Sequence, residues 1–579
     1  MPRFGIVSPL LGLKLDCPTV LIESAFTPDN NAVRVVDSKV VRARGRLAEL
    51  LDADGNPIAA PESVYEITAI AAHVITVDGD HADEFAEGDE IRINGSTDND
   101  ALWTAVSAAF DTDHTDVTVE EELDTDTADG NVFVGRERVL RYHLLRHSAG
   151  FDYLFVFTAA HVFLWAYTTK SLSLLWTVDG GCQAWDAATF NDRLYAVNGA
   201  DKPLEWGVGD DALAEMEYAG CPTAARFVTA YENRLILGGT TETVGGLCAR
   251  RIRWCDLGDA SKWDSGDAGA ADVGGEDGIS GGFGRSGDTL IVLKERSVER
   301  VWAVTTEEVF NAATLPGSVG CAAPGSVVND AEGRLYYFGT DSKIREISAG
   351  EISGRVDAVV RDVSPDALGE ISAAFIPEYN EVWFALPVGS TQNTRTLRYR
   401  GGMWQVTEGA HARFGAYRRQ ESWTIDTLPY ATIDEWDWPS INSPEGLAGS
   451  PVDLVADYNG YTYAAHNCGT DAGSEMEPRF TLANDLAGGA AMRTYKRLHR
   501  IETYWRPTRT SYEVVVEARL DGEVNWRSVA TLSVGGEGRW AAISTPVSLR
   551  AKFFEVRFRP NGAFEFLGAF FDFEYWGER

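Results

Sequence analysis

A loose repeat between residues 136 and 480 constrains the fold of this chain more than any other feature. Each copy has a turn residue, a polar residue and then the start of an apolar strand, and the six clear copies begin 40–55 residues apart. A unit of about 40–50 residues is the size of one four-stranded sheet in a repeating β-architecture. The clear copies are Phe151–Leu154, Asn191–Leu194, Glu232–Leu235, Gly287–Leu290, Glu332–Leu335 and Tyr379–Val382, and weaker ones begin at Glu421 and Asn459.

A second apolar strand with an aromatic or branched residue follows the clear copies. Examples are Leu204–Trp206, Ile252–Trp254, Val301–Trp302, Ile344–Ile347 and Leu397–Tyr399. We expect these hairpins to be the inner strands of successive sheets. One sheet cannot bury both of its faces, whereas six to eight sheets closed into a ring can, and closure leaves few free edges. The pattern predicts a β-propeller-like core over residues 136–480, and a sandwich of unrelated hairpins is the alternative.

The composition favours strands over helices throughout the chain. Aromatic residues make up 11% of the sequence and there are 57 glycines. Aromatic side chains suit pleated, half-buried surfaces, and glycine suits the many tight turns of a β-protein. The predicted fold class is therefore all-β, with an inserted small β-barrel and a C-terminal β-sandwich beside the propeller-like core.

Residues 46–135 are expected to form the inserted barrel. Turns such as Asp78-Gly79 and Asn94-Gly95 separate short alternating runs, a pattern that is typical of a small barrel or sandwich. This segment holds 23 acidic residues against Arg46 and Arg92, a net charge of −21. The predicted strands are at Tyr65–Ile67, Val74–Val77, Ile91–Ile93, Trp103–Val106, Val117–Val119 and Val132–Val134.

The two ends of the chain are expected to be separate units. Residues 1–45 are predicted to be an extended docking segment that contains a hairpin, with Val33–Val36 in one strand and Val40–Arg46 in the other. Within residues 481–579, apolar and polar residues alternate over Tyr512–Ala518, and strands rich in aromatic residues follow. This pattern predicts a β-sandwich. The apolar run Tyr153–Tyr167 fits two strands that turn at Ala159-Ala160, so no membrane-spanning segment is predicted.

The net charge of −36 disfavours both wrapping of nucleic acid and binding to anionic membranes. Seven cysteines are scattered without a CxxC motif, which fits reduced thiols in a protein that folds in the cytoplasm. No metalloprotease, phosphate-loop or nucleophile-elbow motif occurs. We therefore predict no enzyme activity and no catalytic, cofactor-binding or metal-binding residues.

Several residues invite a functional interpretation and have a simpler structural one. His143 and His147 are four apart but lack a third ligand. The acidic runs Asp124–Gly130 and Asp52–Asn56 miss the spacing of a calcium loop and are expected to be turns. The same holds for Asp111, Asp113 and Asp116. An arginine cluster or a carboxylate pair in the mouth of a propeller, as in glycan-cleaving enzymes, stays open, and Trp436 and Trp438 suit either sugar stacking or a subunit contact.

The chain resembles tail-associated proteins of short-tailed bacteriophages. The resemblance lies in the opening Asp29–Arg34 and Val40–Arg46, in Asn233–Gly239 with Arg253–Asp256 and Lys262-Trp263, in the acidic barrel with Gly88–Ile93 and Asn99, and in the ending Phe553–Arg559 and Phe573–Tyr575. It implies a virion protein of the tail, assembled in the host cytoplasm, whose copies form a ring, expected to be a hexamer.

This resemblance also implies partners and a role. The ring would be a tail nozzle or hub below the portal and adaptor, beside tail fibres or tailspikes, and would conduct DNA during ejection without sequence-specific binding. An acidic surface would let the phosphate backbone slide past without adhering. The alternative is a receptor-binding or glycan-degrading propeller at the tail tip.

Overall fold

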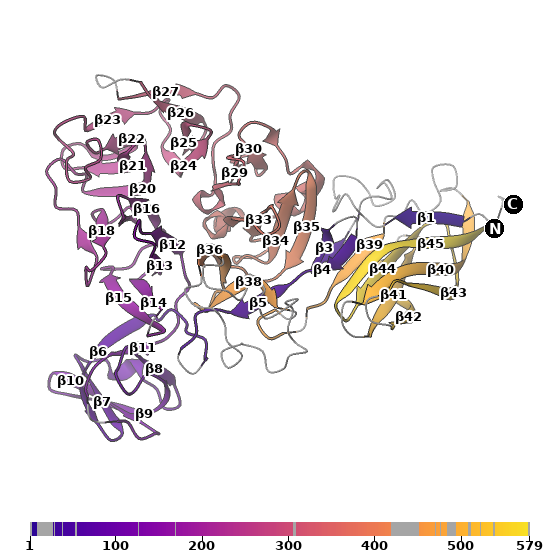
Figure 1. The fold of residues 1–579 in the computed structure, drawn as a ribbon, viewed down its shortest axis with the longest axis horizontal. Coiled ribbons are helices and arrows are strands. Elements are labelled where there is room, and N and C mark those ends of the chain that lie inside the picture. Colours follow the sequence, from indigo (N-terminus) through magenta and orange to yellow (C-terminus); the bar gives the residue numbers. More distant parts are fainter. Residues whose placement is uncertain are drawn as a thin grey trace.

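The computed structural model confirms the all-β class (Figure 1). Within the described ranges the α-helix is α1 (Asp357–Arg361), with short 3₁₀ turns at Ala82–Glu84, Pro324–Ser326, Gly354–Val356 and Pro365–Glu370. The structure describes residues 3–7, 27, 29–36, 39–52, 55–124, 127–167, 169–304, 309–418, 451–468, 471–474, 476–482, 494–507, 511–521, 523–535 and 539–576.

Seven four-stranded antiparallel sheets follow one another along the middle of the chain, and we number them 1 to 7. Sheet 1 is β12 (Arg141–Arg146), β13 (Asp152–Phe157), β14 (His161–Ala166) and β15 (Ser171–Thr177); sheet 2 is β16 (Asp186–Phe190), β17 (Arg193–Val197), β18 (Leu204–Gly207) and β19 (Ala214–Glu215); sheet 3 is β20 (Ala224–Tyr231), β21 (Arg234–Glu242), β22 (Gly246–Trp254) and β23 (Gly269–Asp272). Sheet 4 is β24 (Ile279–Ser286), β25 (Thr289–Lys294), β26 (Val298–Ala303) and β27 (Phe310–Thr314); sheet 5 is β28 (Val328–Asn329), β29 (Leu335–Phe338), β30 (Ile344–Glu346) and β31 (Gly350–Glu351). Sheet 6 is β32 (Ser372–Ile376), β33 (Glu381–Leu386), β34 (Arg395–Arg400) and β35 (Met403–Glu408); sheet 7 is β36 (Arg413–Arg418), β37 (Pro451–Ala456), β38 (Thr462–Cys468) and β5 (Gly45–Ala48).

The sheets form a closed ring. The first strand of each sheet contacts the first strand of the next, and β36 of sheet 7 contacts β12 of sheet 1. The first strands are rich in small residues because they crowd together at the axis. A Cβ at Gly282 would lie 2.6 Å from Cδ1 of Phe227, and one at Gly415 would lie 2.5 Å from Cβ of Tyr142. Glycine at these positions permits the close approach of neighbouring strands.

The repeat seen in the sequence corresponds to the turn between the first and second strands of sheets 1 to 6. Asn191 and Asp192 both have positive φ (48° and 60°), as do Glu232 and Asn233 (48° and 53°). Two consecutive residues in this conformation form the tight hairpin turn whose twist matches that of the strands. In sheet 7, Asn459 instead lies between the second and third strands, and the weak copy at Glu421 lies outside the described residues.

The expected position of the inner strands needs correction. Leu204–Trp206 in β18 and Val301–Trp302 in β26 belong to third strands, and the axis is surrounded by the first strands. Bulky side chains suit the space between neighbouring sheets, whereas several first strands carry glycine where neighbouring strands approach closely. The sequence pattern located the second and third strands and missed the innermost one.

Strand β5 closes the ring from the opposite end of the chain. It pairs with β38, with Ala48 opposite Tyr463 and Leu47 opposite Ala464. Residues 45–48 thus belong to sheet 7 and not to the inserted segment 46–135 that the sequence predicts. Because the last sheet needs a strand that precedes the first sheet, the ring is locked by a contact between distant parts of the chain.

The inserted segment forms a closed six-stranded barrel between β5 and sheet 1. Alternate residues such as Ile75, Val77, Ile91 and Val117 point inward and are fully buried. All six strands expected from the sequence are present. They are β6 (Ser63–Ala71), β7 (Val74–Asp78), β8 (Glu90–Asn94), β9 (Leu102–Asp111), β10 (His114–Val119) and β11 (Asn131–Val134).

A two-sheet sandwich contains strands from both ends of the chain; in Figure 1 it extends to the right of the ring, whereas the barrel lies below the ring at the left. The predicted hairpin forms, but its second strand ends at Arg42 and not at Arg46, because Gly45 begins β5 of sheet 7. The hairpin pairs with the last strand of the chain, so it is part of the sandwich and not a separate unit. One sheet is β3 (Val33–Val36), β4 (Lys39–Arg42), β45 (Phe564–Trp576), β40 (Tyr495–Pro507) and β43 (Ala541–Ala551), with β1 (Arg3–Val7) also paired to β45; the other is β2 (Asn30–Asn31), β39 (Arg479–Leu482), β44 (Phe554–Pro560), β41 (Tyr512–Leu520) and β42 (Arg527–Val534).

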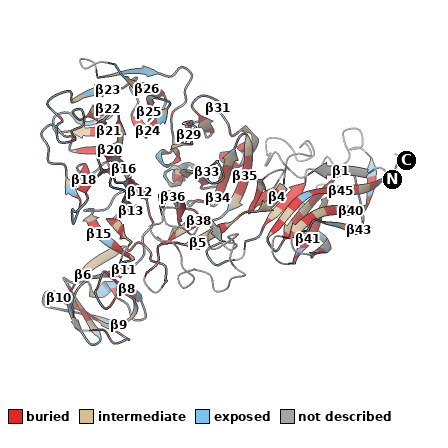
Figure 2. Cartoon of the chain, viewed as in Figure 1, coloured by how far each residue is buried: buried red, intermediate tan, exposed pale blue. Residues whose placement is uncertain are grey.

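Buried residues form separate cores in the sandwich, in the barrel and between neighbouring sheets of the ring (Figure 2). The sandwich core is aromatic, with Phe480, Trp505, Phe558 and Phe566 packed against one another. Aromatic pairs of this kind add stabilisation beyond the area that they bury. Each body of the molecule therefore has its own apolar core.

Candidate functional site

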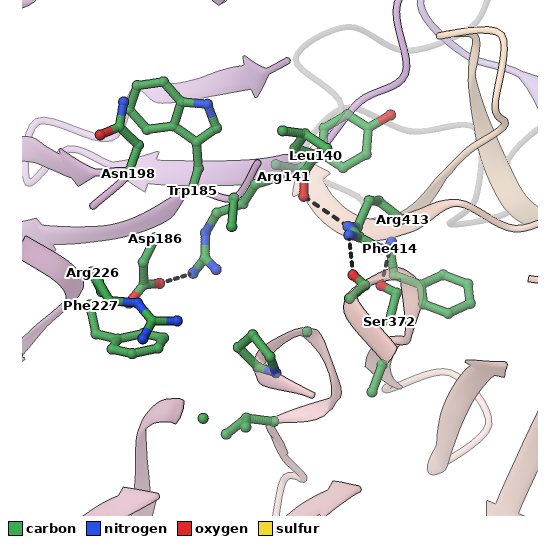
Figure 3. Close-up of a pocket in the computed structure, with 18 of the residues that line it drawn as sticks. Leu140, Arg141, Trp185, Asp186, Asn198, Arg226, Phe227, Ser372, Arg413 and Phe414 are labelled. Carbon is green, nitrogen blue, oxygen red and sulfur yellow. Dashed lines mark hydrogen bonds and ion pairs between the residues drawn. The ribbon is translucent and has the colours of Figure 1, made fainter. Parts of the chain in front are cut away.

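A cavity of about 310 Å³ lies on the axis of the ring (Figure 3). All seven sheets, with the segments that lead into them, contribute to its lining. Its volume lies at the small end of the range that holds small-molecule ligands. The lining includes Leu140, Arg141, Trp185, Asp186, Asn198, Arg226, Phe227, Phe283, Pro324, Ser372, Arg413 and Phe414.

One of the arginines in the lining, Arg413, is occupied by backbone carbonyls. Its Nε donates to the oxygen of Leu140 at 3.0 Å, while Nη1 and Nη2 donate to the oxygens of Glu370 and Gly369, each at 2.7 Å. These bonds join sheet 7 to the segments that lead into sheets 1 and 6. Burial lowers the pKa of Arg413 from its ordinary value. Its role here is to hold the ring closed at the point where the chain completes it.

A second arginine is paired with the carboxylate of the lining. Nη2 of Arg141 lies 2.9 Å from Oδ1 of Asp186, and Oδ2 of Asp186 accepts a hydrogen bond from the backbone of Val228 at 2.9 Å. Sheets 1, 2 and 3 are linked in this way. Burial raises the pKa of Asp186 above its ordinary value, although the charge of Arg141 opposes the shift. The Nε of Arg141 is buried and has no hydrogen-bond partner among the described residues.

The third arginine has no carboxylate partner in the described part of the chain. Arg226 is exposed, and its guanidinium carbon lies 5.5 Å from the centre of the Phe227 ring. The stem of the Arg226 side chain passes two glycines. A Cβ added at Gly199 would be 3.2 Å from Cγ of Arg226, and one added at Gly239 would be 3.5 Å from Cβ of Arg226. Both glycines have positive φ. Among the described residues its guanidinium has neither a hydrogen bond nor an ion pair, so its donors stay available.

The lining carries three arginines and one aspartate in a protein whose net charge is −36. Its described residues include no histidine, cysteine or second carboxylate. The carboxylate pair that glycoside hydrolysis requires is therefore not formed by the residues that line this cavity. Guanidinium groups match carboxylate and phosphate oxygens in shape and charge, so this arrangement suits the binding of a small anion.

The two histidines singled out in the sequence lie apart from any metal-ligand arrangement. His143 Nε2 is 2.8 Å from Oγ1 of Thr189, and burial lowers the pKa of His143 to about 3. His147 Nε2 lies 4.0 Å from Oδ2 of Asp192 in a surface turn. Across the described ranges, no group of three potential metal ligands occurs.

The acidic runs contain structural turns and surface contacts. Oδ1 of Asp52 accepts from the backbone of Asn56 at 2.7 Å, and Oδ2 pairs with Arg92 at 2.7 Å. Oδ1 of Asp129 accepts from Ser96, and residues 125–126 of that run lie outside the described ranges. Asp111 accepts from the hydroxyl of Thr112 at 3.0 Å, Asp113 pairs with His114 at 2.9 Å, and Asp116 accepts from Thr76 at 2.7 Å. Trp436 and Trp438 also lie outside the described residues.

Sequence reasoning missed the axial cavity, although a signal for it exists. Pairs of small residues occur in the first strands of five sheets, at Ala187-Ala188, Ala224-Ala225, Gly281-Gly282, Ala373-Ala374 and Gly415-Ala416. In a strand interior, such pairs indicate the close approach of another backbone. Their recurrence before the second strands of these five sheets marks the axis of the ring.

Comparison of the sequence with models of known protein families finds no match, and comparison with curated proteins finds none either. Among the described residues, no helix has the length and apolar character needed to span a membrane.

Proposed function

We propose that this chain is a structural protein of a bacteriophage tail, whose copies assemble in the host cytoplasm into a nozzle or hub below the portal and adaptor. We also propose that the ring of seven sheets is a β-propeller. The resemblance to tail-associated proteins of short-tailed phages suggests the role. The described architecture supports it, since a closed ring, a barrel and a sandwich that are joined by buried contacts suit a stiff building block.

The observation that carries the proposal is the way in which both ends of the chain are locked to distant elements. Strand β5 completes sheet 7, and β4 pairs with β45 in the sandwich. A load applied to one end of such a protein reaches the ring through backbone hydrogen bonds. In sheet 7 the edge of β38 is paired in this way, and β5 becomes the outer strand of the sheet.

The joint between the sandwich and the ring is polar and buried. Arg34 lies between the carboxylate of Glu381 and the aromatic side chain of Tyr379. The guanidinium carbon of Arg34 is 3.1 Å from the centre of that aromatic ring. The side-chain oxygens of Asn30 and Asn31 accept hydrogen bonds from the backbones of Val406 (3.0 Å) and Glu408 (2.9 Å). These contacts hold β2 and β3 against the outer strand of sheet 6, which suits a fixed angle between the two bodies.

On this proposal, DNA passes between copies and not through the ring of one chain. The axial cavity has the volume of a small molecule, and every sheet contributes side chains to it. A lumen wide enough for a duplex would have to be enclosed by several protomers, for which we propose six. Acidic surface such as the exposed run Glu120–Glu122 of the barrel would repel the phosphate backbone where it faced that lumen.

Electron micrographs of the purified full-length protein, alone and mixed with a phage adaptor ring, test the proposal. We expect rings of six copies that stack coaxially on the adaptor. Particles that stay monomeric under both conditions would contradict it. The second candidate, a receptor-binding propeller at the tail tip, is favoured by the arginines of the axial cavity, and binding of host polysaccharide to the isolated protein would support it.

A further inference from the structure

We propose that the axial cavity binds a small oxyanion, a carboxylate or phosphate group on a small molecule, with Arg226 as its principal contact. This inference goes beyond the structural role proposed above and does not depend on it. It rests on the charge of the lining, on the availability of one guanidinium and on the shape of its surroundings.

The charge is local to the cavity. Arg141, Arg226 and Arg413 line the cavity together with a single carboxylate, that of Asp186, although acidic residues outnumber basic ones in the whole chain. Cavities that are lined by one sign of charge concentrate ligands of the opposite sign. Such a bias inside a strongly acidic protein is the opposite of what its composition predicts for an arbitrary site.

The three arginines differ in what their donors already bind. Arg413 is held by carbonyl oxygens, and Arg141 is bound on one side to Asp186. Arg226 makes neither kind of contact within the described residues, and its described polar contact is with the face of Phe227. A planar guanidinium with free donors binds a carboxylate or a phosphate through two parallel hydrogen bonds.

Arg226 lies in the same part of the lining as the ion pair of Arg141 and Asp186. Its stem lies near Gly199 and Gly239, and Figure 3 shows its guanidinium beside the ring of Phe227. Gly282 permits the Phe227 ring to pack closely, since a Cβ there would approach Cδ1 to 2.6 Å. An anion bound by Arg226 would therefore lie between an aromatic ring and a second, partly engaged guanidinium.

A second donor faces the same cavity. Ser372 lines the cavity and is 4% exposed, and its oxygen accepts a hydrogen bond from the backbone of Phe414 at 3.2 Å. Its hydroxyl proton has no acceptor among the described residues. An oxyanion in the cavity would provide one, because a hydroxyl can accept one hydrogen bond and donate another at the same time.

Isothermal titration calorimetry on the intact protein tests the proposal, with glucuronate, inorganic phosphate and glucose as probes. We expect glucuronate or phosphate to bind and neutral glucose not to bind. The stronger of the two anions identifies whether the group recognised is a carboxylate or a phosphate. Absence of binding by both anions, or equal binding of glucose, would overturn the proposal.

Variants locate the site. Arg226→Gln is expected to weaken anion binding at least tenfold, and Arg226→Lys, which keeps the charge but loses the fork, to weaken it less. Arg400→Gln is the matched control, since it removes an exposed arginine from the end of β34 outside the cavity, and it should bind like the wild type. Unchanged affinity in Arg226→Gln, in a sample whose thermal unfolding matches that of the wild type, would overturn the assignment.

Discussion

Arg34 and Glu381 are 347 residues apart in the chain and form a buried ion pair, with Nε 3.2 Å from Oε1. Their side chains are 5% and 3% exposed. Arg34 comes from the hairpin that joins the sandwich, and Glu381 begins the second strand of sheet 6. Burial acts to raise the pKa of Glu381, but the charges of Arg34 and Arg398 outweigh it and lower that pKa. The pair joins the N-terminal part of the chain to the ring.

Replacement of Arg34 by methionine should strongly destabilise this joint. It leaves the carboxylate of Glu381 buried without its main partner, and breaking a buried pair in this way costs about 3–5 kcal/mol. Urea unfolding monitored by tryptophan fluorescence measures the loss. Arg527→Met removes one member of an exposed pair with Glu523 and should cost less than about 1 kcal/mol. Similar losses in the two variants would show that the buried pair has no special role.

His466 should make stability depend on pH. Its Nε2 lies 2.8 Å from Oδ2 of Asp453 and its Nδ1 lies 3.1 Å from Oε2 of Glu378. Burial opposes protonation, but the two carboxylates prevail and raise the pKa of His466. The protonated imidazole therefore stabilises the fold fully below the ordinary value of about 6.5, and this contribution is lost as the pH rises through the raised pKa.

The test compares thermal unfolding of the wild type and of His466→Gln between pH 5 and 9, a range set by the ordinary pKa of about 6.5. The unfolding temperature of the wild type should exceed that of His466→Gln by most at the acidic end of this range, and the difference should shrink as the pH rises. Asp453→Asn keeps the imidazole but removes one of its two carboxylate partners. The difference in unfolding temperature between Asp453→Asn and His466→Gln should therefore disappear at a lower pH than the difference between the wild type and His466→Gln. Parallel curves for the wild type and His466→Gln would contradict the prediction.

Glu378, which contacts His466, should make the stability of the fold fall at acidic pH. Burial acts to raise its pKa, but the hydrogen bond and charge of His466 lower it to about 2. The stability that this carboxylate supplies is present above its ordinary value and is lost as the pH falls toward about 2. Glu378→Gln should therefore lose less stability than the wild type on acidification from pH 5 to pH 3, around the ordinary value of about 4.3. Equal losses would show that Glu378 does not titrate with folding.

Arg413→Ala should weaken the contact of sheet 7 with sheets 1 and 6. Three carbonyl oxygens, those of Leu140, Gly369 and Glu370, lose a charged donor, and the expected cost is about 2–4 kcal/mol. Hydrogen exchange should rise in β36 and β12 before it rises in the sandwich. Arg418→Ala, at the exposed end of the same strand, is the control and should change stability by less than about 0.5 kcal/mol. Uniform exchange across the molecule would count against a local role.

Asn94→Ala should release the barrel from the ring without unfolding the barrel. The Nδ2 of Asn94 donates to the oxygen of Leu172 at 2.9 Å, and its Oδ1 accepts from the nitrogen of the same residue at 3.2 Å. Without this side chain both backbone groups of Leu172 lose their partner, at an expected cost of about 1–3 kcal/mol. Calorimetry should show a separate barrel transition, which Asn311→Ala, an exposed site on β27, should not produce. A single unchanged transition would contradict the prediction.

The proposed role in DNA passage predicts weak binding to duplex DNA. With a net charge of −36, the full-length protein should not retain DNA in a filter assay at about 100 mM salt. The measurement is repeated on the assembled particle, because the surface that lines a lumen is complete only there. Tight, salt-resistant binding would contradict the sliding mechanism and leave the architecture untouched.

Local chemistry explains why so much of the fold was predictable. The barrel strands alternate between buried and partly exposed residues, as in His114–Val119, and the turn at Asn191-Asp192 has residues that accept positive φ. Both signals act within a few residues, so the strands of the barrel and the second and third strands of sheets 1 to 6 could be placed. Sheet 7 was marked less well because its fourth strand comes from Gly45–Ala48, far away in the sequence.

The candidate site could not be predicted in the same way. Arg141, Arg226 and Arg413 are ordinary arginines in the sequence, spaced 85 and 187 residues apart. They line one cavity only because the ring brings the first strands of sheets 1, 3 and 7 to a common axis. His143 and Asp52, which the sequence analysis expected to have structural roles, contact Thr189 and Arg92 and lie outside the cavity lining.

The amino-acid sequence alone determined the all-β class, the position of most hairpins and the concentration of acidic residues in the barrel, because alternation, turn preference and charge are properties of neighbouring residues. The tertiary structure alone decided that β5 completes sheet 7, that Arg34 meets Glu381 and that three arginines surround one cavity. These contacts depend on how the ring closes, and closure is set by the packing of all the sheets together, which no short stretch of sequence encodes.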